Sequence, residues 1–292
     1  MKNFRLLAGL LAVASLACGG SARADQFINF SQMGAPGAFA FEALPDVIHS
    51  DGQTSFASNN IIAYFSHTGV TGTNRDQFEF WGGAYAGYTK ASAGGPGNSW
   101  GITNPNIGME YYYNVIQPTT CGTCDGYSIY TVSPILSVTL PSGSSDTTGV
   151  RAGSNHYSFY FGMTHYYKHG KWSISANPFA VLYGAPSLND VTTAPGQTSR
   201  PRGGFSYTVA DVAAGYDILP GLGIGLHHSL QLNNRSDSSF ASSTQGFIGP
   251  AVSYFGFAKH GLYLAANLNF NYYHSSNLKS SPYFAAYIVQ YF

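Results

Sequence analysis

Apolar and polar residues alternate with a period of two along several stretches of this chain. From Leu222 to Leu232 every second residue is leucine or isoleucine, except His228, and the positions between them hold small or polar residues. The stretches Leu262 to Tyr273 and Tyr130 to Leu140 have a similar pattern. Because successive side chains of a β-strand point to opposite faces, each stretch predicts a strand with one apolar and one mostly small or polar face.

The composition indicates that the apolar faces meet lipid. Only 9% of the residues are charged, against about 25% in an ordinary soluble domain. A soluble sandwich or lipocalin-like barrel would carry charged residues on its outer face. The mean hydropathy is −0.05, and no apolar run reaches the roughly 18 residues of a membrane-spanning helix. A bilayer otherwise admits only closed barrels, so we expect an all-β, transmembrane antiparallel β-barrel.

Weaker alternation elsewhere in the chain predicts about 12 strands with up-and-down topology. The expected strands lie near residues 37–44, 56–67, 78–88, 105–116, 127–140, 156–168, 171–184, 205–218, 221–233, 246–258, 261–273 and 282–292. Three tight turns, near residues 169–170, 219–221 and 259–261, alternate with longer polar connections. Bacterial barrels keep short turns and both chain ends in the periplasm, and this alternation fits that arrangement.

The N-terminus has the features of an export signal. Residues 1–24 combine an early positive charge, an apolar segment and the small-x-small site Ala22-Arg23-Ala24, so we expect a signal peptide and a mature start at Asp25. Cys18 offers a lipoprotein alternative, although Ser15 stands where lipoprotein signals prefer leucine. Residues 25–292 would form one barrel domain in the cell outer membrane. The chain ends on Phe292 after alternating apolar positions, which is typical of strands recognised by the barrel-assembly machinery.

After removal of residues 1–24 the chain has 10 basic and 13 acidic residues, a formal charge of −3, which excludes a basic surface for nucleic acid. Two cysteines then remain, Cys121 and Cys124, in a glycine-containing stretch. In an exported protein this spacing favours a small-loop disulfide. A redox or metal site is the alternative, but the strand–helix context of the first and the further ligands of the second are not visible.

Polar residues on the inward faces are the candidates for contact with a solute. They are Glu110, Asp211, His227, Gln231, Asn267, Asn269 and Asn271. These side chains could either close a packed interior by hydrogen bonding or line a solute path. The few charges within the strands argue against a strongly ion-selective pore, and we expect no metal and no cofactor.

Serine and histidine two residues apart share a strand face and could serve a lipid hydrolase. Of three such pairs, His274 with Ser276 continues a lipid-facing row, whereas His156 with Ser158 and His227 with Ser229 face the other way. Catalysis would also need an orienting group and an oxyanion donor, and we therefore expect no enzyme.

Three stretches resemble a family of outer-membrane transporters associated with the meta pathway of phenol degradation. They are residues 104–111, 133–143 and 249–254, each a strand with its turn. The resemblance implies a barrel of about twelve strands that passes aromatic or other hydrophobic compounds, and it carries over no catalytic residues. The Cys121–Cys124 loop departs from it.

We therefore expect a channel that passes small hydrophobic or aromatic solutes by passive diffusion, with outer-membrane lipids and those solutes as partners. Two alternatives remain: a lipid hydrolase, and a non-conducting structural or surface barrel with a filled lumen, since small barrels are filled by side chains.

Overall fold

The computed structural model describes residues 26–30, 33–50, 53–90, 99–120, 126–140, 156–186, 204–234, 243–275 and 282–292. The expected signal peptide, Asp25, Ser276 and the pair Cys121 and Cys124 lie outside these residues. The strands are β1 (Phe39–Ser50), β2 (Gln53–Phe65), β3 (Asp76–Lys90), β4 (Ser99–Thr120), β5 (Tyr127–Thr139), β6 (His156–His169), β7 (Trp172–Ala176), β8 (Phe179–Pro186), β9 (Gly204–Leu219), β10 (Leu222–Asn234), β11 (Ser243–Tyr254), β12 (Leu262–His274) and β13 (Tyr283–Tyr291).

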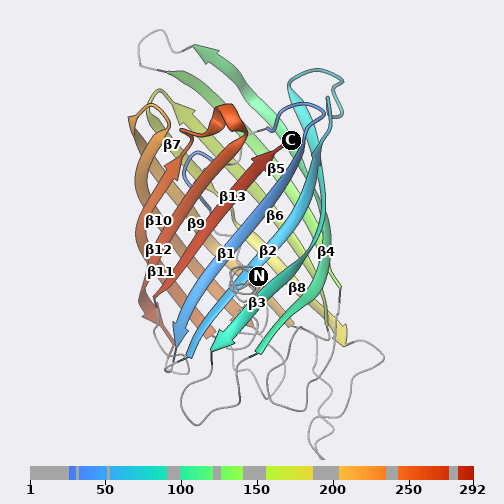
Figure 1. The fold of residues 1–292 in the computed structure, drawn as a ribbon, viewed down its shortest axis with the longest axis vertical. Coiled ribbons are helices and arrows are strands. Elements are labelled where there is room, and N and C mark those ends of the chain that lie inside the picture. Colours follow the sequence, from blue (N-terminus) through green and yellow to red (C-terminus); the bar gives the residue numbers. More distant parts are fainter. Residues whose placement is uncertain are drawn as a thin grey trace, which may run out of the picture.

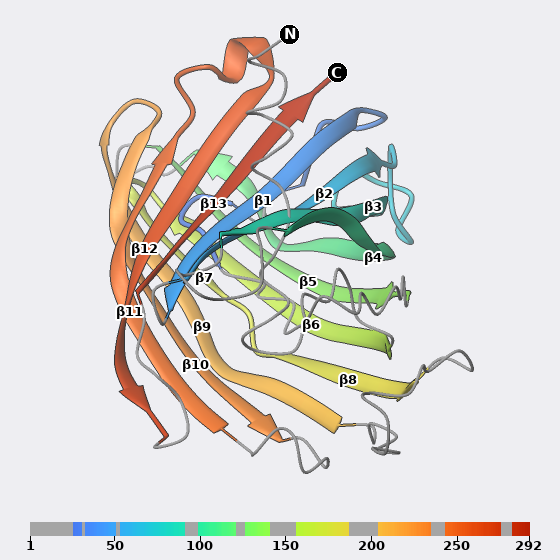
Figure 2. The same ribbon diagram turned by 60° about the horizontal axis from the view of Figure 1, so that its bottom comes forward.

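The strands form one closed antiparallel barrel (Figures 1 and 2). Each pairs with its neighbours in sequence, except that β7 and β8 do not pair with each other and both pair with β6 and β9. β13 closes the ring against β1, with Ala40 opposite Tyr291. Since β7 and β8 are two parts of a single crossing, the wall has twelve crossings, which confirms the predicted barrel and its up-and-down connections. The described helix is one short 3₁₀ turn, Ala258–His260. No described helix is long and apolar enough to cross a bilayer.

The two faces of the wall differ as the alternation predicts. On β10, Leu226 is 59% exposed on the outside and His227 is fully buried on the inside. On β12, Phe270 faces outward and Asn269 inward. On these two strands an apolar row thus covers the outer surface and a polar row faces the interior.

The crossing predicted as one strand over residues 171–184 is interrupted at Asn177 and Pro178. Proline has no N–H to give to the ladder. The Asn177 side chain supplies hydrogen bonds to β6 at this break in the ladder. Its Oδ1 accepts from the Met163 N–H at 3.1 Å, and its Nδ2 donates to the Tyr160 hydroxyl at 2.8 Å.

Other predicted boundaries also shift. The first strand continues to Ser50, not 44, and β4 runs from Ser99 to Thr120, beyond both predicted ends. β11 ends at Tyr254 because the chain then enters the 3₁₀ turn, so the predicted strand to 258 and the tight turn at 259–261 become one longer connection. The tight turns at Gly170 and Gly221 are confirmed, and both glycines have positive φ.

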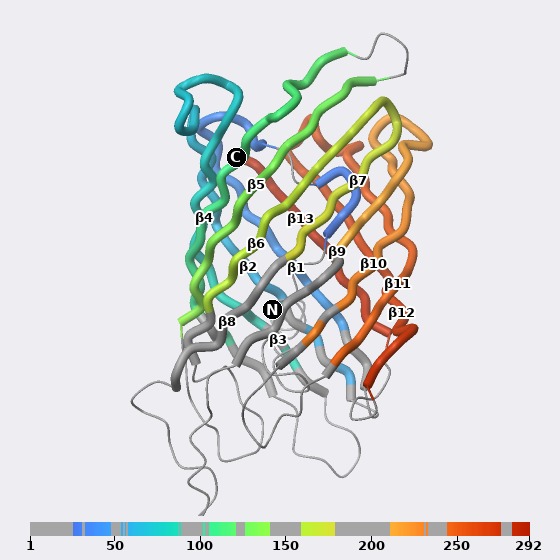
Figure 3. Tube along the Cα trace, turned by 180° about the vertical axis from the view of Figure 1, so that it is seen from behind, coloured from blue at the N-terminus to red at the C-terminus, as the bar shows by residue number. Residues whose placement is uncertain are grey.

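We call the end at which β1 begins and β13 finishes the terminal end, and the opposite end the loop end. Residues 26–30 do not lie outside the terminal end. They are inside the barrel (Figure 3), all buried, and we call them the lumenal segment.

Candidate functional site

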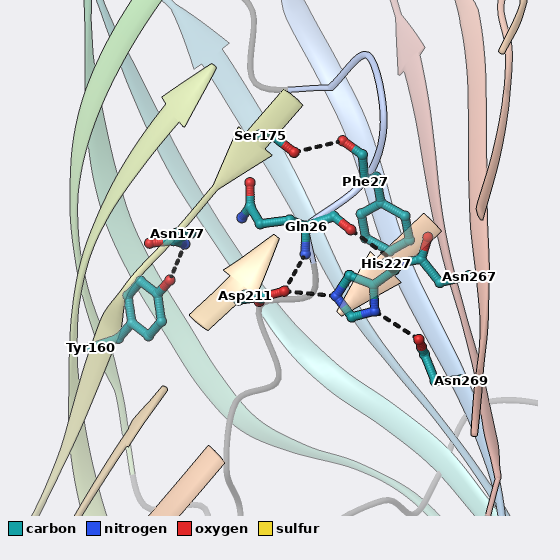
Figure 4. A network of polar contacts seen from close by, with 9 residues as sticks. All are labelled: Gln26, Phe27, Tyr160, Ser175, Asn177, Asp211, His227, Asn267 and Asn269. Atoms are coloured by element: carbon teal, nitrogen blue, oxygen red, sulfur yellow. Dashed lines mark hydrogen bonds and ion pairs between the residues drawn. The ribbon is translucent and has the colours of Figure 1, made fainter. Parts of the chain in front are cut away.

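Four of the seven predicted lumenal residues meet in one cluster inside the barrel (Figure 4). Asp211 comes from β9, His227 from β10, and Asn267 and Asn269 from β12. Each is at most 1% exposed. Alternation places them on inward faces, and the closure of the barrel brings the three strands together.

His227 is the centre of this cluster. Its Nε2 lies 2.7 Å from Asp211 Oδ1, and its Nδ1 lies 2.7 Å from Asn269 Oδ1. Both ring nitrogens therefore face oxygen atoms, so the ring ties β10 to β9 and to β12. Burying a polar group costs free energy unless the group is hydrogen-bonded, and these contacts meet that requirement.

The lumenal segment is bound to the same cluster by its backbone. The Gln26 N–H donates to Asp211 Oδ1 at 3.2 Å, and Asn267 Nδ2 donates to the Gln26 carbonyl at 3.0 Å. Farther along, Ser175 Oγ on β7 donates to the Phe27 carbonyl at 3.1 Å. The predicted polar rows thus contact a piece of this chain in the structure.

Asn29 makes a second polar anchor. Its Nδ2 donates to Asp217 Oδ1 at 2.7 Å and to Ser253 Oγ at 3.2 Å, while its Oδ1 accepts from Lys168 Nζ at 2.9 Å. Lys168 and Asp217 are themselves paired at 2.5 Å. The carboxamide is therefore held on both sides by an ion pair of the barrel wall.

Aromatic rings surround the rest of the segment. The ring of Phe27 is 5.8 Å from that of Tyr287, and the ring of Phe30 is 4.9 Å from Tyr287 and 5.4 Å from Phe255. These rings belong to a buried apolar cluster that also includes Phe65 and other aromatic residues of the wall. Such ring pairs stabilise packing beyond simple area burial.

Three carboxylates lie on the wall formed by β1, β3 and β4. Glu79 is directly opposite Glu110 in the ladder, and Glu42 is close enough for its charge to act on both. Tyrosine hydroxyls contact two of them: Tyr112 donates to Glu79 at 2.6 Å, and Tyr287 donates to Glu42. The predicted residue Glu110 is thus part of an acidic group whose other two members were not among the predicted lumenal contacts.

The remaining predicted residues lie apart from the His227 cluster. Asn271 is half-buried on β12 in line with Asn267 and Asn269, and its Oδ1 is a buried oxygen without a hydrogen-bond partner among the described residues. For Gln231 the structure describes the backbone, which pairs with Gln245.

The structure also bears on the predicted serine–histidine pairs. His227 and Ser229 are both fully buried in the lumen, and His274 Nδ1 contacts the Ser275 carbonyl at 3.1 Å. A serine–histidine contact of 2.7 Å occurs elsewhere, between Ser128 and His169 on neighbouring strands. This pair could not be predicted from residue spacing along one strand, because its two members lie on different strands.

Within the described residues, no group of three or more histidine, cysteine or acidic side chains is arranged to hold a metal.

The family described as "Putative MetA-pathway of phenol degradation" matches residues 37–287 of the sequence. The chain belongs to this family. The resemblance seen in the three strand-and-turn stretches is thereby confirmed, and the match leaves residues 26–30 outside it.

One solved structure shows the same architecture, and two others are more distantly similar. An outer membrane channel from Pseudomonas putida F1 superposes with a TM-score of 0.64 at 13% identity, covering 94% of this chain and 99% of that chain. The NanC porin gives 0.43 at 9% identity over 85% and 98%. The translocator domain of the autotransporter NalP from Neisseria meningitidis gives 0.42 at 10% over 100% and 95%. Among curated proteins the sequence has no match. The Pseudomonas channel establishes that the fold is that of an outer membrane barrel.

Proposed function

We propose that this protein is an outer-membrane channel through which small, weakly charged aromatic or hydrophobic solutes pass by diffusion, and that the lumenal segment closes the lumen in the state observed. The observation that carries the proposal is the bound segment itself. Its aromatic rings and amide groups occupy the polar rows and the aromatic cluster of the barrel interior.

Membership of a family named for phenol degradation supports an aromatic solute. The interior provides both surfaces that a phenol-like molecule needs, namely ring faces and hydrogen-bonding groups. No energy-coupling motif is evident in the sequence, which favours passive diffusion.

The orientation and partners follow the same proposal. The terminal end would face the periplasm, as in bacterial barrels generally. The outer surface would contact membrane lipids through its apolar rows. Phe292, which is 77% exposed at the end of β13, would serve recognition by the barrel-assembly machinery.

The test is solute flux into liposomes containing refolded mature protein, with phenol, toluene and a neutral sugar as solutes. A variant in which residues 26–30 are replaced by Gly-Ser-Gly-Ser-Gly keeps the chain length but removes the native side chains by which this segment contacts the wall. We expect aromatic flux through the wild type, at least tenfold faster flux through the variant, and little sugar flux through the wild type. The absence of flux through both proteins would contradict the channel and favour a non-conducting structural barrel.

A further inference from the structure

We propose that the aromatic pocket filled by Phe30 is a binding subsite for a single-ring aromatic solute, and that the solute and the lumenal segment compete for it. The inference rests on the proposed function and specifies where in the lumen the solute binds. In the observed state the segment is then an internal ligand of the channel.

The walls of this pocket belong to the barrel and not to the segment. Tyr287 is on β13, and Phe255 directly follows β11. Tyr263 continues the wall, 5.4 Å from Phe255 and 5.5 Å from Tyr291. Because β13 is held by ladders to β1 and β12, Tyr287 keeps its place when Phe30 leaves, and the Phe255 N–H is held by the Gly221 carbonyl. A pocket that accepts the benzyl group of phenylalanine also fits a phenol or toluene ring.

The way in which the segment is held makes exchange feasible. It joins none of the described strands by ladder pairing, and its contacts are single side chains and isolated backbone groups. Removing Phe30 from the pocket therefore breaks ring contacts without opening the barrel wall.

The surroundings also indicate which aromatic solute is favoured. Glu42 is 4% exposed and already accepts a hydrogen bond from the phenol group of Tyr287, and Glu79 accepts one from Tyr112. A carboxylate has capacity for further hydrogen bonds. A hydroxylated ring can use this acceptor, whereas a ring bearing a carboxylate would bring a further negative charge into a buried pocket beside an acidic group. We therefore assign the subsite to neutral phenolic rings.

Binding can be measured by fluorine NMR with 4-fluorophenol and the mature protein in lipid nanodiscs, with empty nanodiscs as the reference. Phe30→Ala vacates the pocket. Ile28→Ala is the matched control, because Ile28 is buried in the same segment but packs against Ala213 and Ala251. We expect Phe30→Ala to bind 4-fluorophenol at least tenfold more tightly than the wild type, Ile28→Ala to change affinity less than threefold, and 4-fluorobenzoate to bind none of them.

The double variant Phe30→Ala/Phe255→Ala should lose the gain, since one wall of the pocket is gone. If Phe30→Ala does not fold, Phe30→Leu supplies the same comparison, because it removes the ring and keeps an apolar side chain. An equal gain in Ile28→Ala, or no gain in the Phe30 variants, overturns the subsite. If solutes pass but the Phe30 variants do not bind 4-fluorophenol more tightly, the subsite alone is wrong. If the variants bind more tightly but no solute passes, the subsite stands and the channel is wrong.

Discussion

Asn29 joins the lumenal segment to the Lys168–Asp217 ion pair of the wall. Its φ is +61°, a left-handed conformation that asparagine tolerates better than most residues. The conformation turns the chain so that the carboxamide reaches both Lys168 and Asp217. One residue thus combines a backbone requirement with a side-chain requirement.

Substitutions at Asn29 separate these two requirements. Asn29→Gly keeps the backbone conformation but loses hydrogen bonds to charged groups, which are each worth about 1.5–3 kcal/mol. We expect at least a tenfold shift toward the open channel, measured as open probability in single-channel recordings. Asn29→Ala should shift it further, because alanine adds roughly 1–2 kcal/mol of left-handed strain. An Asn29→Gly channel that opens no more often than the wild type would show that these hydrogen bonds do not hold the segment.

At the scale of single strands, β3 contains two adjacent glycines in different surroundings. A Cβ on Gly83 would lie 2.0 Å from the Asn60 carbonyl oxygen, which belongs to the backbone and cannot move away. A Cβ on Gly82 would lie 3.7 Å from Ile107 Cγ2, an ordinary contact.

We therefore expect Gly83→Ala to destabilise the barrel by about 1–3 kcal/mol or more, as overpacking does, and Gly82→Ala to change its stability little. Urea unfolding in lipid and heat-modifiable migration in gels measure both variants. Equal stability of the two variants would mean that β3 shifts to accommodate the added carbon.

The strands were predictable because lipid on one side and a polar interior on the other impose alternation on the sequence. Leu226 and His227 show how completely this local rule decides the face. The break at Asn177 and the end of β11 were missed, because a side chain that substitutes for a ladder bond has no periodic signature. The position of the lumenal segment inside the barrel was also missed. Gln26 contacts Asn267, which is 241 residues away in the sequence, and no local pattern encodes such a contact.

For the molecule as a whole, the described lumenal charges are unevenly distributed. Glu42, Glu79 and Glu110 share one wall, whereas Lys168 is paired with Asp217. The low number of charges in the sequence argues against strong ion selectivity, but three carboxylates on one wall can still bias a narrow lumen.

In the variant with residues 26–30 replaced, we expect potassium to permeate better than chloride. Changing the three glutamates to glutamine should lower the permeability ratio severalfold, measured as the reversal potential in a potassium chloride gradient. The single change Glu110→Gln, as the control, should have a smaller effect. An unchanged ratio in the triple variant would place the selectivity elsewhere in the lumen.

The lumenal segment precedes every described strand, yet its partners extend from β6 to β13. Because Tyr287 lies on β13, the last strand in the sequence, the binding site is complete only after β13 has joined the sheet, and the first residues of the barrel domain reach their final positions late in assembly. A newly assembled molecule in which the ring closes before the segment binds has an unsealed passage. The permeability of the membrane during synthesis then depends on how quickly this final step follows ring closure.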